Sequence, residues 1–207
     1  MSARRDEAQE GTTLIELLVA LSLLALLSVY AVGAIRYLQN FDRVEAVIED
    51  RAVIEAARTH LRRSIEAMQI AFIVKDGTSP RLAFAGGKNS VTFVTPADSR
   101  LDYGGLYLVR FGLSEETSGM HPLVTARRAF RPRMDLDMTG GSLTVLDKVA
   151  TLNFSYFGSP QEGSKPEWYE NWPETNVLPQ AIRVDLVFGA QDQRAFPPLE
   201  IPIAVAK

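Results

Sequence analysis

One carboxylate near the N-terminus, at the head of an apolar run, has the clearest chemical potential in the chain. Glu16 precedes residues 17–35, which contain no charged side chain. A carboxylate costs about 2.5 to 3.5 kcal/mol at the centre of a bilayer and less near its edge, so it normally has a partner. Thr12 lies one helical turn before Glu16 and directly follows Gly11. A cut between Gly11 and Thr12 would free an α-amino group to pair with Glu16 of the same chain or of a neighbouring copy.

The apolar run has the length of a membrane-spanning helix. As a helix, residues 17–35 would extend about 28 Å, close to the roughly 30 Å hydrocarbon core of a bilayer. Two simpler interpretations stay open. A secretory signal peptide has a shorter apolar region and a small-residue exit, which residues 28–34 match only loosely. An unprocessed single-pass anchor fits the length but leaves Glu16 unexplained.

Catalytic candidates are few elsewhere in the 207 residues. His60 and His121 have no Ser or Asp at the spacing of a catalytic triad, and we expect both to be surface histidines without a role. The pair Gly140-Gly141 lacks the Lys and the helix signal of a phosphate-binding loop. The chain has no cysteine, which excludes disulfides and thiolate metal sites. We therefore expect a protein that is not an enzyme, with no catalytic residue and no cofactor.

One acidic turn imitates the opening of a calcium-binding loop. Asp135, Asp137 and Thr139 alternate along the chain, and Gly140 follows. A full twelve-residue loop would need a closing Glu near position 146, which is a leucine. We therefore expect an Asp-rich turn and no metal site, with calcium as the alternative.

The apolar run is followed by a second helical pattern. Residues 36–72 contain no Pro or Gly, and their apolar side chains recur mostly at steps of three or four. This spacing predicts an amphipathic helix that continues the membrane helix and presents one stripe to a sheet. A turn cluster at residues 75–80 ends it.

Beyond that turn the apolar period shifts towards two, which predicts strands. The expected strands are residues 81–85, 90–95, 106–113, 123–130, 142–146, 150–157, 181–188 and 195–206. The alternation in residues 106–111 is typical of a sheet with one covered side. Pro197, Pro198 and Pro202 indicate that the last strand is short, irregular or at an edge. The predicted fold class is α+β, with a long N-terminal helix, part membrane and part amphipathic, packed on an antiparallel β-rich head.

Charge excludes one class of partner. The net charge is −3, the sequence pI is about 5.5, and no block of basic residues stands out. Nucleic-acid binding is therefore not expected. Arg4 and Arg5 precede the apolar run, whereas Arg36 and Arg43 follow it, so the positive-inside rule does not fix the orientation.

The N-terminal motif resembles a known processing site. A short polar leader, a Gly, then Thr-Leu-Ile-Glu running into Leu-Leu-Val-Ala-Leu is similar to the cleavage motif of type IV pilins and type II secretion pseudopilins. The resemblance implies a leader at residues 1–11 that a prepilin peptidase removes between Gly11 and Thr12. It also implies N-methylation of Thr12 and a role for Glu16 in filament assembly. Thr12 stands where this family usually has Phe, and Gly33 stands where major pilins often have a kinking Pro.

The C-terminal half resembles the J family of minor pseudopilins in type II secretion systems. The resemblance lies in residues 149–157, Trp168, Trp172 and residues 178–186, where Leu-Pro-Gln-Ala-Ile-Arg-Val-Asp-Leu enters a strand. It implies a pilin-like fold, with a transmembrane and assembly helix at residues 12–35 and a periplasmic head at residues 36–207 that includes the second half of the long helix.

The same resemblance implies location, partners and role. The chain would cross the inner membrane once, in contact with its lipid. It would join minor pseudopilins I and K, with H as a further candidate, in a tip complex that starts pseudopilus assembly, with the major pseudopilin G added below. The alternatives are a minor type IV pilin or a membrane-tethered periplasmic binding or hydrolase domain.

Three aromatic residues lie in a polar loop at residues 161–176. Trp168, Tyr169 and Trp172 either cover an open edge of the sheet or form an interface anchor for a neighbouring pseudopilin. Burial of the indoles in an isolated head would favour the first role.

Overall fold

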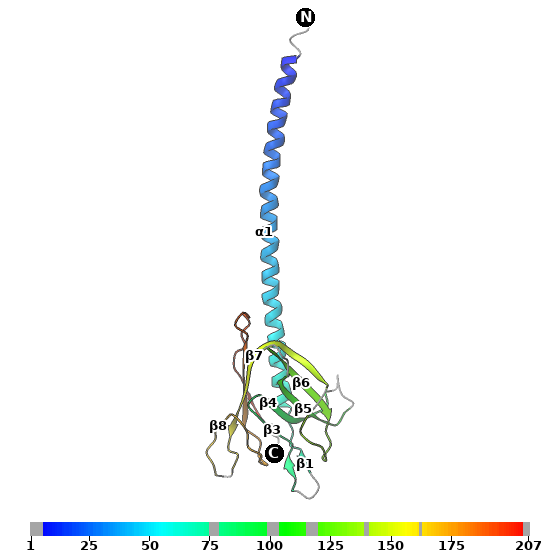
Figure 1. Cartoon of the computed structure of the whole chain (residues 1–207), viewed down its shortest axis with the longest axis vertical. Coiled ribbons are helices and arrows are strands. Elements are labelled where there is room, and N and C mark those ends of the chain that lie inside the picture. The colour runs from blue at the N-terminus through cyan, green and yellow to red at the C-terminus, as the bar shows by residue number, and fades with distance from the viewer. Residues whose placement is uncertain are drawn as a thin grey trace. The chain divides into compact units, whose positions relative to one another are not determined.

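The computed structural model describes residues 6–74, 79–98, 104–114, 120–138, 141–161 and 163–204, and the side chains of all of these except residues 6–13 and 35–48. The chain divides into two compact units, Met1–Asp50 and Arg51–Lys207, and each is described by itself. The helix α1 (Asp6–Glu66) contributes to both units and runs unbroken through Gly33 (Figure 1). The predicted long N-terminal helix is confirmed.

The end of α1 differs from the sequence prediction, which continued the helix to residue 72. The last regular bond joins the amide of Ala67 to the carbonyl of Arg63, and the amide of Met68 reaches back only three residues, to Ile65. The amide of Gln69 then donates to the carbonyl of Val94 at 2.9 Å. The chain therefore leaves the helix because a distant strand supplies its next backbone partner.

Ten strands follow α1 in the described part of the chain. They are β1 (Phe72–Ile73), β2 (Arg81–Leu82), β3 (Ala85–Gly86), β4 (Ser90–Pro96), β5 (Leu106–Leu113), β6 (His121–Ala129), β7 (Ser142–Gly158), β8 (Glu167–Tyr169), β9 (Ala181–Phe188) and β10 (Leu199–Pro202). Two of these, β5 and β9, have the bounds that the sequence predicts. The predicted strand at residues 81–85 is instead the separate strands β2 and β3. The prolines act as expected, because β10 is short, lies at a sheet edge and ends at Pro202.

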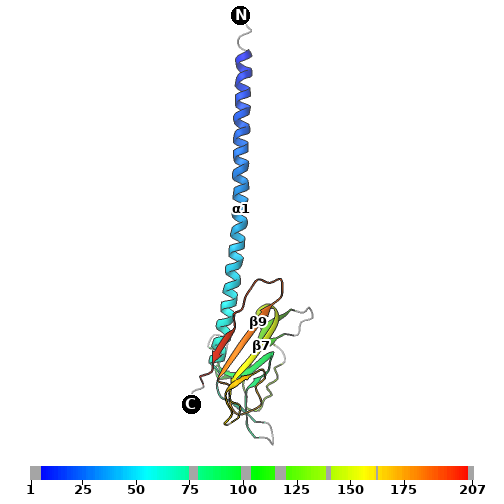
Figure 2. The ribbon, with the colours of Figure 1, turned by 90° about the vertical axis from the view of Figure 1, so that its left-hand side faces the viewer.

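All strand pairings are antiparallel. The main sheet has the order β10-β9-β7-β6-β5-β4-β3, with β8 added to β7, while β1 and β2 form a separate pair. The long strand β7 replaces two predicted strands, at residues 142–146 and 150–157. Its first half pairs with β6. Its second half pairs with β9, which runs beside it in Figure 2, and the register between them shifts between Val149 and Thr151. Lys148, just before the shift, has φ 57°, which fits a local bulge.

The main core of the second unit lies between the last turns of α1 and one face of the sheet. The buried residues of α1 are Ile54, Ala57, Leu61 and Ile65, and Met68 just after the helix continues the stripe. Their spacing of three and four is the stripe that the sequence predicts. They pack with side chains of seven strands, among them Phe93, Phe111, Phe154 and Tyr156. The α+β fold class is therefore confirmed for this unit.

A smaller core covers the other face of the sheet at β4 and β5. It contains Ala71, Ile73, Ala83, Val94 and Leu108, with partly buried side chains from residues 130–138 packed against it. The expectation of a sheet with one covered side is therefore wrong at β5. Leu108 and Val109 face opposite ways along the strand, and both are fully buried.

Candidate assembly segment and partner surface

The first unit contains the apolar segment Leu14–Ala34, whose 21 residues have a mean hydropathy of 2.4 and no buried side chain. The segment extends about 31 Å, which matches the hydrocarbon core of a bilayer. Its side chains are exposed on every side of the helix, with Leu27 at 67% and Val29 at 73%. Such a surface is unfavourable in water, so a lipid or protein environment must cover it.

The two serines of this segment are compatible with an apolar surrounding. The hydroxyl of Ser22 donates to the carbonyl of Val19, and the hydroxyl of Ser28 donates to the carbonyl of Leu24, both at 2.8 Å. These bonds satisfy the hydroxyl protons without water. The helical backbone satisfies its own amides in the same way, which is the requirement for a chain that crosses lipid.

Glu16 is the one charged residue within Leu14–Ala34, and its side chain is exposed. Thr12 lies four residues earlier in α1, so the two positions share one face of the helix. The side chain of Thr12 lies outside the described residues. Cleavage after Gly11, methylation of Thr12 and assembly through Glu16 therefore stay predictions.

Trp172 lies in the core of the second unit. Only 6% of the residue is exposed, and its Nε1 donates to the carbonyl of Val177 at 2.9 Å. Its amide donates to the carbonyl of Gly86, which ties the loop to β3. Tyr169 packs edge-on against its indole, with ring centroids 5.6 Å apart. Trp172 therefore covers the edge of the sheet at β3, which is the first of the two roles expected for the aromatic loop residues.

Trp168 has a different environment, with 39% of the residue exposed. It lies on β8, which pairs with the end of β7, and its ring centroid is 5.3 Å from that of Phe157. The guanidinium of Arg183 lies 4.3 Å from the centre of its indole and forms an ion pair with Glu200 at 2.6 Å. The sequence analysis did not single out Phe157 and Arg183 as site residues. Their places in the alternation of β7 and β9 put both on the face of the sheet that points away from the main core. The candidate partner surface is defined by Trp168, Phe157 and Arg183, whereas Tyr169 pairs with Tyr156 and packs against the main core.

The two histidines are half-buried, so the expectation of surface histidines is wrong. The ring of His60 packs edge-on against Phe111 with centroids 5.5 Å apart. This happens because His60 lies between the buried Ala57 and Leu61 on the border of the apolar stripe. Burial, followed by the nearby charge of Arg127, lowers the pKa of His60. Nδ1 of His121 lies 3.0 Å from the carbonyl oxygen of Ser114.

The acidic turn is linked to an arginine. The Nη2 of Arg128 donates to the backbone carbonyls of Asp135 at 2.9 Å and Asp137 at 3.2 Å. Thr139 and Gly140 lie outside the described residues. No group of three or more His, Cys, Asp or Glu side chains that could hold a metal occurs within the described ranges.

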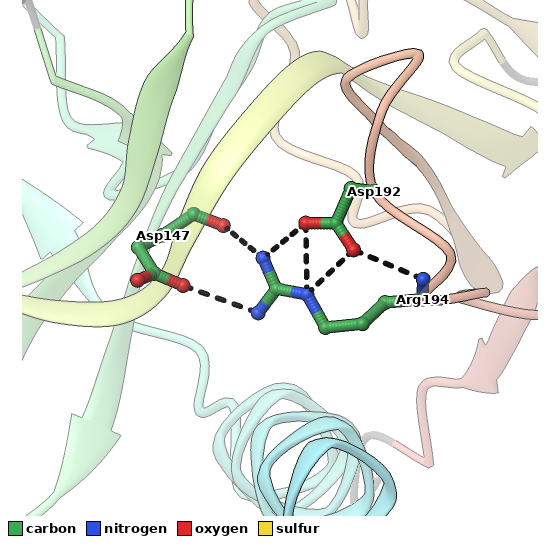
Figure 3. A network of polar contacts seen from close by, with 3 residues as sticks. All are labelled: Asp147, Asp192 and Arg194. Carbon is green, nitrogen blue, oxygen red and sulfur yellow. Dashed lines mark hydrogen bonds and ion pairs between the residues drawn. The ribbon is translucent and has the colours of Figure 1, made fainter. Parts of the chain in front are cut away.

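An ion network that the sequence analysis missed anchors the loop between β9 and β10. Arg194, with 9% of its side chain exposed, donates from Nε and Nη2 to the carboxylate of Asp192 and from Nη1 to that of Asp147 at 3.1 Å (Figure 3). Its guanidinium also lies 4.3 Å from the ring centre of Phe188. The hydrogen bond from Arg194 lowers the pKa of Asp192. Arg58 of α1 binds the same loop at the carbonyl of Pro197.

Together these features define a protein that has, among its described residues, one candidate membrane-spanning helix, and an α+β head. Over 199 aligned residues the chain is 26% identical to a protein named Type II secretion system protein J from Xanthomonas campestris pv. campestris. The alignment covers 93% of this chain and 92% of that relative. No protein-family model matches the chain. The similarity confirms the resemblance to type II secretion pseudopilins of the J family. It also supports a protein that crosses a membrane once and takes part in protein transport.

Proposed function

We propose that the chain is a minor pseudopilin of a type II secretion system and that it helps to start assembly of the pseudopilus. The similarity to a type II secretion protein J over nearly the whole chain carries this proposal. The exposed apolar segment Leu14–Ala34, with Glu16 at its head, supports it independently. A structural role also agrees with the name of that relative, which describes a component of a secretion system and does not describe a reaction.

The proposed mechanism depends on charge neutralisation in the membrane. Removal of residues 1–11 converts the amide of Thr12 into an α-amino cation, which N-methylation leaves charged. Glu16 then pairs with such a cation, on its own chain or on a neighbouring subunit. A bare carboxylate is unfavourable in lipid by up to about 3 kcal/mol, so the pair favours lateral packing of helices over isolated subunits. The leucines and valines of residues 17–35 supply the packing surface.

The head sets partner choice in this proposal. We infer a pilin-like fold, in which the turns of α1 that carry Ile54 to Ile65 pack on the antiparallel sheet. The head would lie in the periplasm and contact minor pseudopilins I and K, with H as a further candidate, above the major pseudopilin G. Trp168 is the proposed contact, because an exposed indole beside a guanidinium is typical of interface anchors.

Copurification in native cells tests this proposal. The full chain, tagged at the C-terminus, is isolated in mild detergent after in-cell crosslinking, and pseudopilins I, K and G are identified by mass spectrometry. We expect I and K with the wild-type chain and their loss, together with loss of secretion, with Glu16→Ala. Glu45→Ala is the matched control, because it removes a carboxylate of α1 beyond the apolar segment. Normal recovery of I and K with Glu16→Ala would contradict the assembly mechanism.

A further inference from the structure

Large apolar side chains are exposed along the segment that follows α1. Ile70, Phe72 and Val74 are 51%, 42% and 37% exposed, and they alternate with the buried residues Ala71 and Ile73. We name these three exposed residues the β1 stripe. The stripe is about 13 Å long, because each residue of an extended chain adds about 3.3 Å. Such a row of apolar side chains on a head surface marks an interaction site, and it shares no residue with the membrane segment or with the candidate partner surface at Trp168.

A turn with two unpaired arginines lies beside the β1 stripe. The amide of Val74 donates to the carbonyl of Pro132 at 2.7 Å. Arg131 and Arg133 flank this proline, and both are exposed. Their guanidinium groups make no hydrogen bond or ion pair with the residues that the structure describes. This part of the head therefore combines apolar side chains with two available cations.

The neighbouring charged groups do not neutralise these two arginines. Residues 128–137 carry three arginines and two aspartates, an excess of one positive charge in a chain whose net charge is −3. Arg128 is the arginine that lies with the two aspartates, since its Nη2 donates to the backbone carbonyls of both. On β2, which pairs with β1, the charge of Arg81 is matched by Glu174 at 3.1 Å. The β1 stripe therefore has a border of net positive charge.

This border selects among the possible occupants of the stripe. A second copy of the chain would bring a second Arg131 and Arg133 to the same surface, and like charges repel. A small anion would leave the apolar side chains uncovered. A bilayer surface takes up side chains that reach about 5 to 10 Å into its interface, whereas about half of each residue of the β1 stripe is buried in the head. A protein segment that is apolar along its length and acidic at one end satisfies both parts of the surface.

We propose that the β1 stripe, together with Arg131 and Arg133, binds an extended segment of a partner protein. In that segment every second side chain is aliphatic, and acidic residues follow at one end. The aliphatic side chains cover the stripe, and a carboxylate binds a guanidinium through charge-assisted hydrogen bonds. This docking site lies on the head and acts apart from helix packing in the membrane.

Peptide binding to the full chain in phosphatidylcholine nanodiscs, followed by fluorescence anisotropy, tests the proposal. Three labelled probes have blocked ends. The first alternates Val with Thr over five residues and ends in two Glu, the second ends instead in two Gln, and the third is the first with each Val replaced by Ser. We expect binding of the first probe only. Equal binding of the Gln probe would exclude the role of the arginines, and equal binding of the Ser probe would replace the proposal by a small-anion site.

Matched variants assign the binding to this surface. Arg133→Ala should weaken binding of the first probe about two- to fivefold, as expected for an exposed ion pair. Arg51→Ala is its control, because Arg51 of α1 is also exposed and makes no hydrogen bond or ion pair within the described ranges. Ile70→Gln should weaken binding about fivefold. Val187→Gln, which changes an exposed valine of β9, should leave the affinity unchanged. Equal losses in the two members of either pair would contradict the proposal.

A photocrosslinking probe gives a second readout. With benzoylphenylalanine in place of the central Val of the first probe, we expect crosslinks on residues 70–74 and 131–134, mapped by mass spectrometry. Crosslinks confined to other segments would overturn the proposal. Displacement of the first probe by phosphatidylglycerol vesicles, but not by phosphatidylcholine vesicles, would overturn it in favour of a membrane surface. Failure of the membrane mechanism would leave these results unchanged, because Thr12 and Glu16 are not part of this surface.

Discussion

Tyr156 lies directly against Gly86. A Cβ at position 86 would come within 2.8 Å of both Cε1 and Cζ of the Tyr156 ring and 2.9 Å of the Cβ of Trp172. The hydroxyl of Tyr156 donates to the carbonyl of Gly87 at 2.8 Å, and its ring is fully buried. Gly86 therefore lets β3 approach β7 and the Trp172 loop closely, which closes this end of the sheet.

The first prediction concerns this close approach. Gly86→Ala should lower the free energy of unfolding by about 1 to 3 kcal/mol, because two buried rings and their backbone must shift to admit the methyl group. Gly87→Ala is the matched control, since its nearest neighbour would be the carbonyl oxygen of Ser90 at 3.4 Å. Urea unfolding followed by tryptophan fluorescence measures both. Equal stability of the two variants would contradict the packing of Gly86.

The second prediction concerns the anchored loop between β9 and β10. Arg194→Gln should lower the free energy of unfolding by about 2 kcal/mol, because it leaves the partly buried carboxylate of Asp192 without its charged partner. Arg81→Gln should lower it by less than about 1 kcal/mol, since the Arg81–Glu174 pair is exposed to water and screened by salt. Denaturant unfolding of both variants at two salt concentrations checks the difference. A larger effect at Arg81 would exclude the anchoring role.

The third prediction is a pH dependence at His60. Because burial and Arg127 lower its pKa in the folded state, the unfolded state binds its proton more readily. The free energy of unfolding should therefore fall as the pH drops below the ordinary value of 6.5 and level off below the folded pKa. His60→Gln should remove this part of the pH dependence, whereas His121→Gln should not. Unfolding curves of the wild-type chain and both variants between pH 5 and 8 measure it, and a slope unchanged by His60→Gln would refute the assignment.

The fourth prediction separates the two tryptophans. Trp172→Ala should lower the free energy of unfolding by about 3 to 5 kcal/mol, because it empties a buried site and removes one of the two donors to the carbonyl of Val177. Trp168→Ala should cost about 1 kcal/mol, as expected for a half-exposed ring with one cation–π contact. Copurification with pseudopilins I and K should nevertheless decrease for Trp168→Ala. Undiminished copurification would remove Trp168 from the partner surface.

Local patterns in the sequence predicted most of the head. The apolar spacing from Ile54 to Ile65 matches the buried stripe of α1, and the alternation in β5 and β9 gave their bounds. Prolines at 197, 198 and 202 correctly predicted a short edge strand. These features depend on neighbours within one turn or one strand, which a sequence pattern records.

The errors arise where distant backbone or side-chain contacts decide the structure. The helix pattern runs on past Glu66, and only the bond from Gln69 to Val94 ends it. The irregularity around Lys148 interrupts the alternation of β7, because Leu146, Val149 and Leu152 are buried at steps of three, so one strand looks like two. β8 has only three residues in a polar loop, and its strand character comes from pairing with β7.

The candidate sites divide in the same way. Glu16 could be singled out because one charge interrupts an apolar stretch, which composition reveals directly. Asp147 and Arg194 are far apart in the sequence and lie on different segments, so no spacing connects them to one ion network. Trp172 and Trp168 look alike in the sequence, and only the path of the loop buries one and exposes the other.

The fifth prediction addresses the claim on which the membrane mechanism depends, the creation of an amine one turn from Glu16. Intact-mass and N-terminal peptide mass spectrometry of the chain from its native inner membrane, with and without an active prepilin peptidase, tests this directly. We expect Thr12 with one N-methyl group as the first residue in cells that have the peptidase, and residues 1–11 retained in cells that lack it. A chain that keeps Met1 to Gly11 in both would contradict the account.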